Sequence, residues 1–254
     1  MSNISDYVLT RDRRDSLVLL LACAAGSVDA IGYLGLDHVF TANMTGNTVL
    51  LGLALGQGHL LAVLRNLLAL VGFAVGVALG AWIVQAGGNL GDWDRRVTWA
   101  VRLEAVALAA FTLLWHLLAQ PRTPIGLHLL IVLSAAAMGL QSAAVRKLNL
   151  PGVATTYVTG TVTSLVAAFA HRFRSTLRGD AAAQAVRDAI RWKHETRMQA
   201  SVFIIYGVSA ALSGYLQVHV PRLVALPALC AVLAVLVAVL FSKGAQPAPS
   251  QATP

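Results

Sequence analysis

Threonine and glycine residues form a polar motif that occurs twice in this otherwise apolar chain. The first copy is Phe40-Thr-Ala-Asn-Met-Thr-Gly-Asn-Thr-Val49, and the second is Ala154-Thr-Thr-Tyr-Val-Thr-Gly-Thr-Val-Thr163. A helix that begins at Thr-Gly presents free backbone N–H groups and the positive end of its dipole, which suit an anion or a carbonyl-bearing solute. The predicted substrate-binding residues are therefore Asn43, Thr45, Gly46, Asn47, Thr159, Gly160 and Thr161. The alternative is structural, because small and hydroxyl residues also pack membrane helices together.

Two further polar residues precede the two copies, Asp29 before the first and Gln141 before the second. Asp29 lies well inside an apolar stretch, where a carboxylate is costly unless it is paired or hydrated. It could bind a proton or Na⁺ that is coupled to solute movement, or it could hydrogen-bond to the backbone of the polar motif. Both residues are included in the predicted site.

The sequence contains no motif for catalysis. It lacks a nucleotide-binding glycine loop, a His-Glu-x-x-His motif and a serine elbow. His116 and His128 have no third ligand near them in sequence, and the two cysteines, Cys23 and Cys230, lie inside apolar stretches. We expect no enzyme activity, no metal site and no cofactor.

The composition predicts a membrane protein, since 57% of the 254 residues are hydrophobic and only 12% are charged. A membrane-spanning helix needs about 20 largely apolar residues. Six stretches meet that length: 16–36, 60–84, 98–119, 126–145, 199–219 and 222–242. Two shorter apolar stretches, 46–58 and 160–170, follow the two motifs. The net charge of +8 then indicates topology and not nucleic-acid binding.

Counting basic residues favours six spans with both termini in the cytoplasm. If the two short stretches enter and leave by the same face, 16 Lys and Arg residues lie inside and 3 lie outside; if they cross, the division is 13 to 6. Residues 180–198 are basic and partly apolar, and they could lie on lipid headgroups or extend the fifth span into the cytoplasm.

The two halves of the chain align beyond the motif, because residues 73–82 match residues 206–215, small residue for small residue. With three crossings in each half, the second half must be inverted relative to the first, as in many secondary transporters. The predicted fold is all-α: a polytopic membrane protein of six transmembrane helices and two short re-entrant half-helices in an inverted 3+3 repeat.

The chain then divides into segments with distinct roles. Residues 1–15 form a cytoplasmic N-terminal segment, and 16–97 form the first membrane repeat with the start of its third span following. Residues 98–125 hold the third span and an outer loop, 126–242 form the second repeat, and 243–254 form a disordered tail.

Charged and small residues in the spans have simpler interpretations. Arg65, Arg102 and Glu104 are placed near the ends of spans, where long side chains reach the interface. Gly72, Gly76 and Gly80 form a ridge of small residues that could pack the halves together or form a homo-oligomer.

The chain resembles the YoaK family of bacterial multi-pass membrane proteins. The resemblance rests on Gly26-Ser-Val-Asp-Ala-Ile31, Phe40-Thr-Ala-Asn-Met-Thr-Gly-Asn-Thr48, Met138-Gly-Leu-Gln141 and Thr156-Tyr-Val-Thr-Gly160, and it covers about residues 17–241. It implies an integral protein of about six spans in the bacterial inner membrane, and it implies no substrate.

Three functions fit these observations. The first is a permease-like transporter of a small polar or anionic solute, with the two Thr-Gly helix starts as its site. The second is a channel that uses the same site as a filter, and the third is a membrane assembly or sensor protein that transports nothing. The expected partners are the lipid bilayer and a small solute, without nucleic acid.

Overall fold

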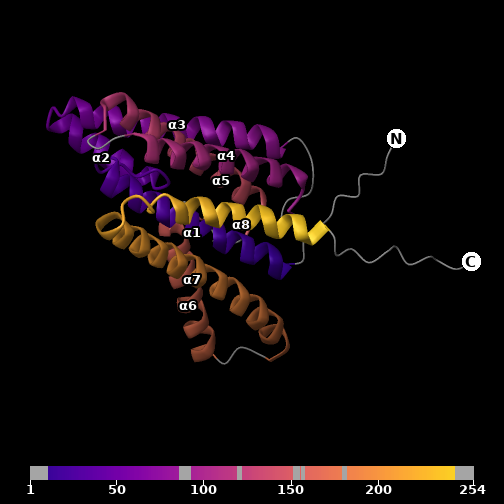
Figure 1. Cartoon of the computed structure of the whole chain (residues 1–254). Coiled ribbons are helices and arrows are strands. Elements are labelled where there is room, and N and C mark those ends of the chain that lie inside the picture. Colours follow the sequence, from indigo (N-terminus) through magenta and orange to yellow (C-terminus); the bar gives the residue numbers. More distant parts are fainter. Residues whose placement is uncertain are drawn as a thin grey trace, which may run out of the picture.

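The described residues of the computed structural model, 11–85, 93–118, 122–150, 155, 158–178 and 182–243, contain eight helices (Figure 1). In chain order these are α1 (Arg11–Gly35), α2 (Met44–Gly56), α3 (Leu60–Gln85), α4 (Arg95–Leu117), α5 (Pro124–Lys147), α6 (Val158–Arg178), α7 (Ala182–His219) and α8 (Leu226–Lys243). The all-α prediction is confirmed for this part of the chain. Of the tail predicted at residues 243–254, Lys243 is the last residue of α8, and the rest lies outside the described part, as do the first ten residues.

Local sequence signals set several of the helix starts. The Asp94 side chain accepts hydrogen bonds from the backbone N–H groups of Arg96 and Val97, at 2.8 and 2.9 Å, and begins α4. Thr123 caps α5 in the same way at Gly126 N, with Pro124 at the first helical position. Each cap satisfies N–H groups that the helix itself leaves free.

Within the described part of the chain, five helices are long and apolar enough to cross a membrane: residues 12–35, 60–85, 95–117, 124–147 and 194–219. The sixth predicted span corresponds to α8, whose apolar part, Leu226–Phe241, is shorter. Residues 182–198 continue into the fifth predicted span as one helix, because α7 runs unbroken from Ala182 to His219. This agrees with the interpretation that residues 180–198 extend that span.

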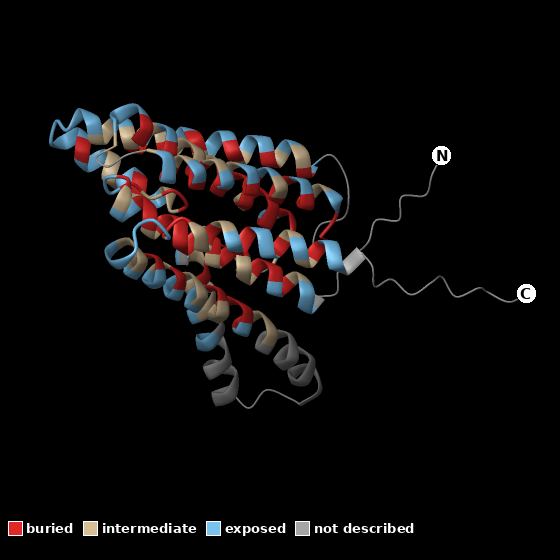
Figure 2. Ribbon diagram, viewed as in Figure 1, coloured by how far each residue is buried: buried red, intermediate tan, exposed pale blue. Residues whose placement is uncertain are grey.

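The exterior of the bundle is apolar, as a bilayer requires. In its apolar stretch α1 has 67% of its residues buried, whereas α7 has 17% and α3 has 28% (Figure 2). The exposed side chains of α3 and α7 include Val71, Leu79, Trp82, Ile204 and Val208. Apolar residues that face outward along a whole helix are stable only against lipid or another apolar surface.

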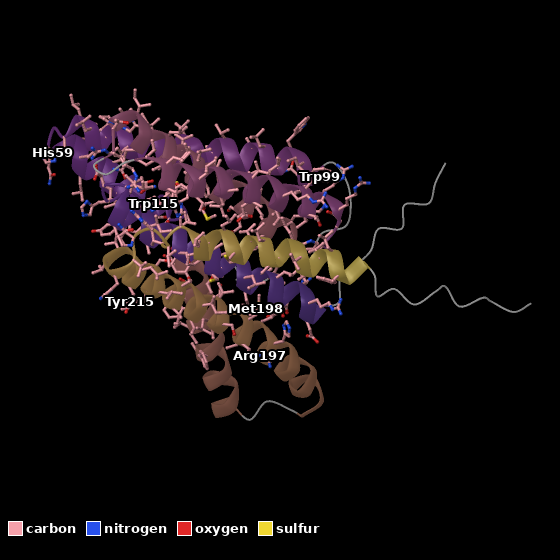
Figure 3. The ribbon with its side chains drawn as sticks, in the orientation of Figure 1. His59, Trp99, Trp115, Arg197, Met198 and Tyr215 are labelled. Carbon is pink, nitrogen blue, oxygen red and sulfur yellow. The ribbon has the colours of Figure 1, made fainter. Side chains whose placement is uncertain are left out.

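Two apolar clusters mark the two ends of the bundle. The larger cluster contains Leu17, Val84, Val97, Val145, Met198 and Val239, and it defines the end at which α1 begins, here called the first end. The smaller cluster contains Leu36, Ala69, Trp115, Leu127 and Val224, and it defines the second end. Helices α1 and α4 therefore run from the first end to the second, whereas α3, α5 and α8 run back. In Figure 3 Trp99 lies near the first end and His59 at the second.

The helix contacts follow one scheme in both halves. Helix α1 packs along α7 and α8, and α5 packs along α3 and α4, so each half packs mainly against helices of the other half. If α1–α4 correspond in order to α5–α8, these two sets of contacts are equivalent. The hairpin contacts of α2 with α3 and of α6 with α7 correspond in the same way, whereas the contact of α3 with α4 has no equally extensive counterpart between α7 and α8 among the described residues.

Glycines allow the closest approaches in both sets. A Cβ added at Gly26 would collide with the carbonyl oxygen of Tyr206 in α7, and one added at Gly139 would collide with the carbonyl oxygen of Phe73 in α3. Phe73 and Tyr206 are corresponding positions in the sequence repeat, so the two approaches are equivalent.

The predicted glycine ridge lies within the chain. Gly72, Gly76 and Gly80 are buried against α5, where an added Cβ would contact Val132, Ala136 and Ala143 respectively. Of the two uses that the spacing allowed, the structure shows packing between the halves.

These approaches predict a large difference between two glycine substitutions. Gly139→Ala places a methyl group against backbone that cannot rotate away, so we expect a loss of about 1–3 kcal/mol in stability. Gly207→Ala is the matched control, because nothing lies within 4 Å of its added Cβ and alanine favours the helix. Unfolding midpoints in mild detergent measure both. Equal midpoints for the two variants would contradict the packing described.

Candidate functional site around the first Thr-Gly motif

The chain turns back along α1 after that helix ends. Asp37 and His38 both have left-handed backbone, with φ of 55° and 63°, a conformation that non-glycine residues adopt rarely. Beyond this turn the carbonyl of Val39 lies against Gly32 of α1, where a Cβ would collide with it. The next residues reach Asp29, further down the same helix. The segment therefore runs antiparallel to α1 and re-enters the bundle.

Asp29 holds the re-entrant backbone. Its Oδ1 accepts hydrogen bonds from the backbone N–H groups of Thr41 at 2.8 Å, Ala42 at 2.6 Å and Asn43 at 3.3 Å. Its Oδ2 accepts a short hydrogen bond from the Tyr206 hydroxyl of α7. Asp29 is 3% exposed, so these donors stand where water would otherwise be. Of the two interpretations of this residue, the bonds match the one in which it binds the motif backbone.

Asn47 completes the support from inside α2. It is fully buried, its Oδ1 accepts from Phe40 N at 2.9 Å, and its Nδ2 donates to Phe40 O at 2.6 Å. An amide is suited to this position, because one face of it can satisfy both backbone groups of a single residue. Asn47 thereby ties the first turn of α2 to the segment that leads into it.

The start of α2 is capped by the motif itself. Asn43 Oδ1 accepts from Gly46 N at 3.1 Å, and Asn43 O accepts from Asn47 N at 3.2 Å. Gly46 is also required sterically, since a Cβ would lie 2.8 Å from the Phe40 ring. Thr45, between them, is exposed. Of the predicted site residues in this copy, Asp29, Asn43 and Asn47 hold the loop, and Thr45 presents its hydroxyl.

The second copy is tied to the bundle by an amide instead of a carboxylate. Gln141 is fully buried, and its Nε2 donates to Thr155 Oγ1 at 2.8 Å and to Leu21 O of α1 at 3.0 Å. Thr161 is buried, Gly160 is partly buried and Thr159 is exposed at the start of α6. Residues 151–154, 156 and 157 of this region lie outside the described part.

A cavity of about 590 Å³ with both polar and apolar lining residues opens at the second end, beside α2. Its lining joins the turn after α1 to α2 and the start of α3 through Asp37, His38, Gln57, His59, Arg65 and Asn66. Arg65 forms an ion pair with Asp37 at 2.9 Å. The end of α1 and the start of α3 therefore lie at the same end of the bundle, although the motif and α2 lie between them in sequence.

Further contacts close the second end. The Arg122 guanidinium stacks over the Trp115 ring at 3.8 Å and donates to Gly35 O at 3.2 Å, and Trp115 Nε1 donates to Pro221 O at 3.1 Å. Burial lowers the pKa of the Arg122 guanidinium from its ordinary value. His116, one of the two histidines considered as ligands, has its Nδ1 2.7 Å from Thr112 O of its own helix.

Two polar residues of the interior were not identified as site residues from the sequence. Tyr206 was aligned only as the counterpart of Phe73. Its hydroxyl, which Phe73 lacks, is the feature of the sequence that could have indicated a polar role. Glu104 was placed at the interface, but it lies nine residues into α4 and is fully buried. Its spacing from Val97, Val101 and Leu108 puts it on the core-facing stripe of that helix, and this was the signal in the sequence.

The apolar exterior and the helix lengths define the class as a multi-pass helical membrane protein. The chain belongs to the family described as "Protein of unknown function (DUF1275)", which matches residues 17–240.

A curated relative is the UPF0700 transmembrane protein YoaK of Bacillus subtilis (strain 168), which is 44% identical over 153 residues. The matched part is 60% of this chain and 66% of that protein, just under two thirds of its length. The resemblance stated from the motifs is confirmed by both findings. No solved structure matches.

The hydrogen bonds of Asp29 predict an order of stability for three variants. Asp29→Asn removes the charge that four donors share, and we expect a loss of at least about 2 kcal/mol; Tyr206→Phe removes one donor and should cost about 1–3 kcal/mol. The double variant should cost less than the sum, because the two residues share a bond. Unfolding in detergent measures all three.

Tyr215→Phe is the matched control, since Tyr215 lies on the same helix but is 59% exposed. A Tyr206→Phe variant as stable as Tyr215→Phe, or strictly additive effects with Asp29→Asn, would show that the bond contributes nothing.

Proposed function

We propose that the protein crosses the bacterial inner membrane six times, with two re-entrant segments and with both termini in the cytoplasm. Helices α1, α3, α4, α5, α7 and α8 are the crossings, and the first end of the bundle is cytoplasmic. Three observations support this: the re-entry of residues 39–43 along α1, the ion pair between Asp37 and Arg65, and the 16 to 3 division of basic residues.

The topology is tested by reporters that are active on only one side of the membrane. A reporter inserted after Gln57 should be outside and one at Arg95 inside, because α3 lies between them and α2 returns to the face that it left. The opposite placement of both reporters would mean that α2 crosses, and it would overturn the proposal. A reporter at the N-terminus, expected inside, is the control.

We further propose that the protein is a permease-like transporter of a small polar or anionic solute. The observation that carries this proposal is that each half packs mainly on helices of the other half: α1 packs on α7, and α5 packs on α3. Such an arrangement of inverted repeats lets one set of helices rock against the other around a central site, as secondary transporters do. The equivalent glycine contacts at Gly26 and Gly139 support it.

We place the site of this transporter at the starts of α2 and α6; α6 has 21 residues and is longer than the short stretch 160–170 predicted there. In the first, the backbone of residues 41–43 is already held by Asp29, and Asn43 and Asn47 fix the turn. The Thr45 hydroxyl and the positive end of the α2 dipole remain to meet a solute. Thr159 and Gly160 have the corresponding position at the start of α6. The preformed loop costs no ordering when the solute binds.

Transport is tested with purified protein in vesicles, by uptake and counterflow over a panel of small anions, amides and polyols. Saturable uptake with counterflow is expected. Thr45→Val removes one hydrogen bond to the solute and should raise KM about fivefold to tenfold, since one such bond is worth about 1 kcal/mol.

Thr48→Val is the matched control, because Thr48 is also exposed and its hydroxyl donates to Met44 O of its own helix. Unsaturable flux would indicate a channel. Absence of flux for every solute would favour a protein that assembles or senses, and equal KM values for the two variants would remove Thr45 from the site.

A further inference from the structure

Glu104 is a carboxyl group isolated inside the bundle. It is fully buried, and neither carboxyl oxygen has a hydrogen-bond partner among the described residues. It lies about 14 Å along α4 from Arg95 and about 20 Å from Leu117, at 1.5 Å per residue. Both distances are too long for the side chain to reach water at either end of the helix.

The helices that pack against α4 offer no charge at this depth. Helix α4 packs on α5, α8 and α3. Their sequences contain no titratable residue between His128 and Arg146 in α5, between Cys230 and Lys243 in α8, or from Asn66 to Gln85 in α3. On α4 itself, Arg102 has its guanidinium 4.8 Å from the ring of Trp99, which is exposed.

The immediate neighbours of Glu104 along the core face of α4 are Ala100, Val101, Ala105 and Leu108, all buried in the larger apolar cluster. A bound metal cation would need several further oxygen ligands, and these side chains supply none. An ionised carboxylate in such a place would be unstable by many kcal/mol. In this conformation the group is stable only as the neutral acid, with a proton in place.

Asp29 provides the contrast within the same protein. Its four hydrogen-bond donors suit the ionised form, and three of them are backbone N–H groups that cannot turn away. The two buried carboxyl groups therefore have opposite surroundings, which is the arrangement that separates a proton carrier from a fixed anion.

We propose that Glu104 is the proton-binding site that couples solute movement to protons. This rests on the proposed transport function. In the conformation described here Glu104 holds a proton away from water. When α4 moves against α5 and α8 so that one face of the bundle opens, the proton passes from the carboxyl group to water on that side. When the opposite face opens, the carboxylate takes a proton from water on the other side before the helices close. One proton is therefore taken from water on one side of the membrane and returned to water on the other side in each cycle.

The proton site can be tested without any transport. In reconstituted protein, infrared difference spectra should show the carbonyl stretch of a protonated carboxylic acid that shifts on exchange into D₂O. The band should disappear in both Glu104→Gln and Glu104→Leu. The leucine variant is included in case Glu104→Gln fails to fold, because an apolar side chain of similar size suits this core. Asp29→Asn is the control and should keep the band. A band that persists in both Glu104 variants, or no band in the wild type, overturns the proposal.

Coupling is tested in vesicles with an imposed pH difference. The wild type should accumulate solute in response to it, whereas Glu104→Gln should exchange solute but lose the response to the pH difference. A Glu104→Gln variant that is still driven by the pH difference overturns the coupling. If the infrared band behaves as expected but no solute moves in the wild type, the proton site stands, while the transport function and the coupling built on it fall.

Discussion

The structure depends on one carboxylate that satisfies a non-helical backbone inside an apolar bundle. Between α1 and α2 the chain leaves regular structure, and its N–H groups then have no helical acceptor. In a membrane such a segment is tolerated only where the protein supplies the missing partners. Asp29 supplies them to three consecutive residues through a single oxygen. Its second oxygen binds Tyr206, so the same residue also fixes α7 against α1.

The two motifs are held by different chemistry. The first uses a charged acceptor and a buried asparagine, whereas Thr155 of the second is bound by Gln141, a neutral donor that also bonds to α1. A charge-assisted network is stronger than a neutral one. The main helix contacts, α1 with α7 and α8 and α5 with α3 and α4, correspond in the two halves. The residues that hold the two motifs, Asp29 and Gln141, differ in charge.

Much of the architecture could be predicted, because a bilayer restricts the chain to apolar helices of known length. Residues 60–84 and 126–145 were predicted within one or two residues of the helix ends in α3 and α5. The start of α7 was predicted less well, since a helix can continue into water, where the apolar pattern stops. The role of Asp29 was predicted as one of two alternatives. The sequence shows that it is a carboxylate well inside an apolar stretch, but it does not show which groups bind it.

Other features could not be obtained from sequence alone. Asn47 was expected to meet a solute, but its amide is used by Phe40, and only the path of the backbone decides this. The apolar stretch that begins at residue 98 predicts a position near the interface for Glu104, whereas the helix begins three residues earlier, at Arg95, after the Asp94 cap. That difference places the carboxyl group about 4.5 Å further from the start of the helix. The role of Tyr206 depends on the packing of α7 against α1, and no local sequence pattern predicts that contact.

The glycine contacts of α1 with α7 and of α3 with α5 also bear on how the protein would respond to temperature. At Gly26 and Gly139 the backbones of two helices are in contact. If the helices separate inside a bilayer, these faces contact lipid tails, which are as apolar as a leucine side chain. Separating such helices inside a bilayer transfers little apolar surface to water, and that transfer is the source of the heat capacity of unfolding. The bundle should therefore come apart in the membrane with a small change in heat capacity, and its stability should fall almost linearly as temperature rises.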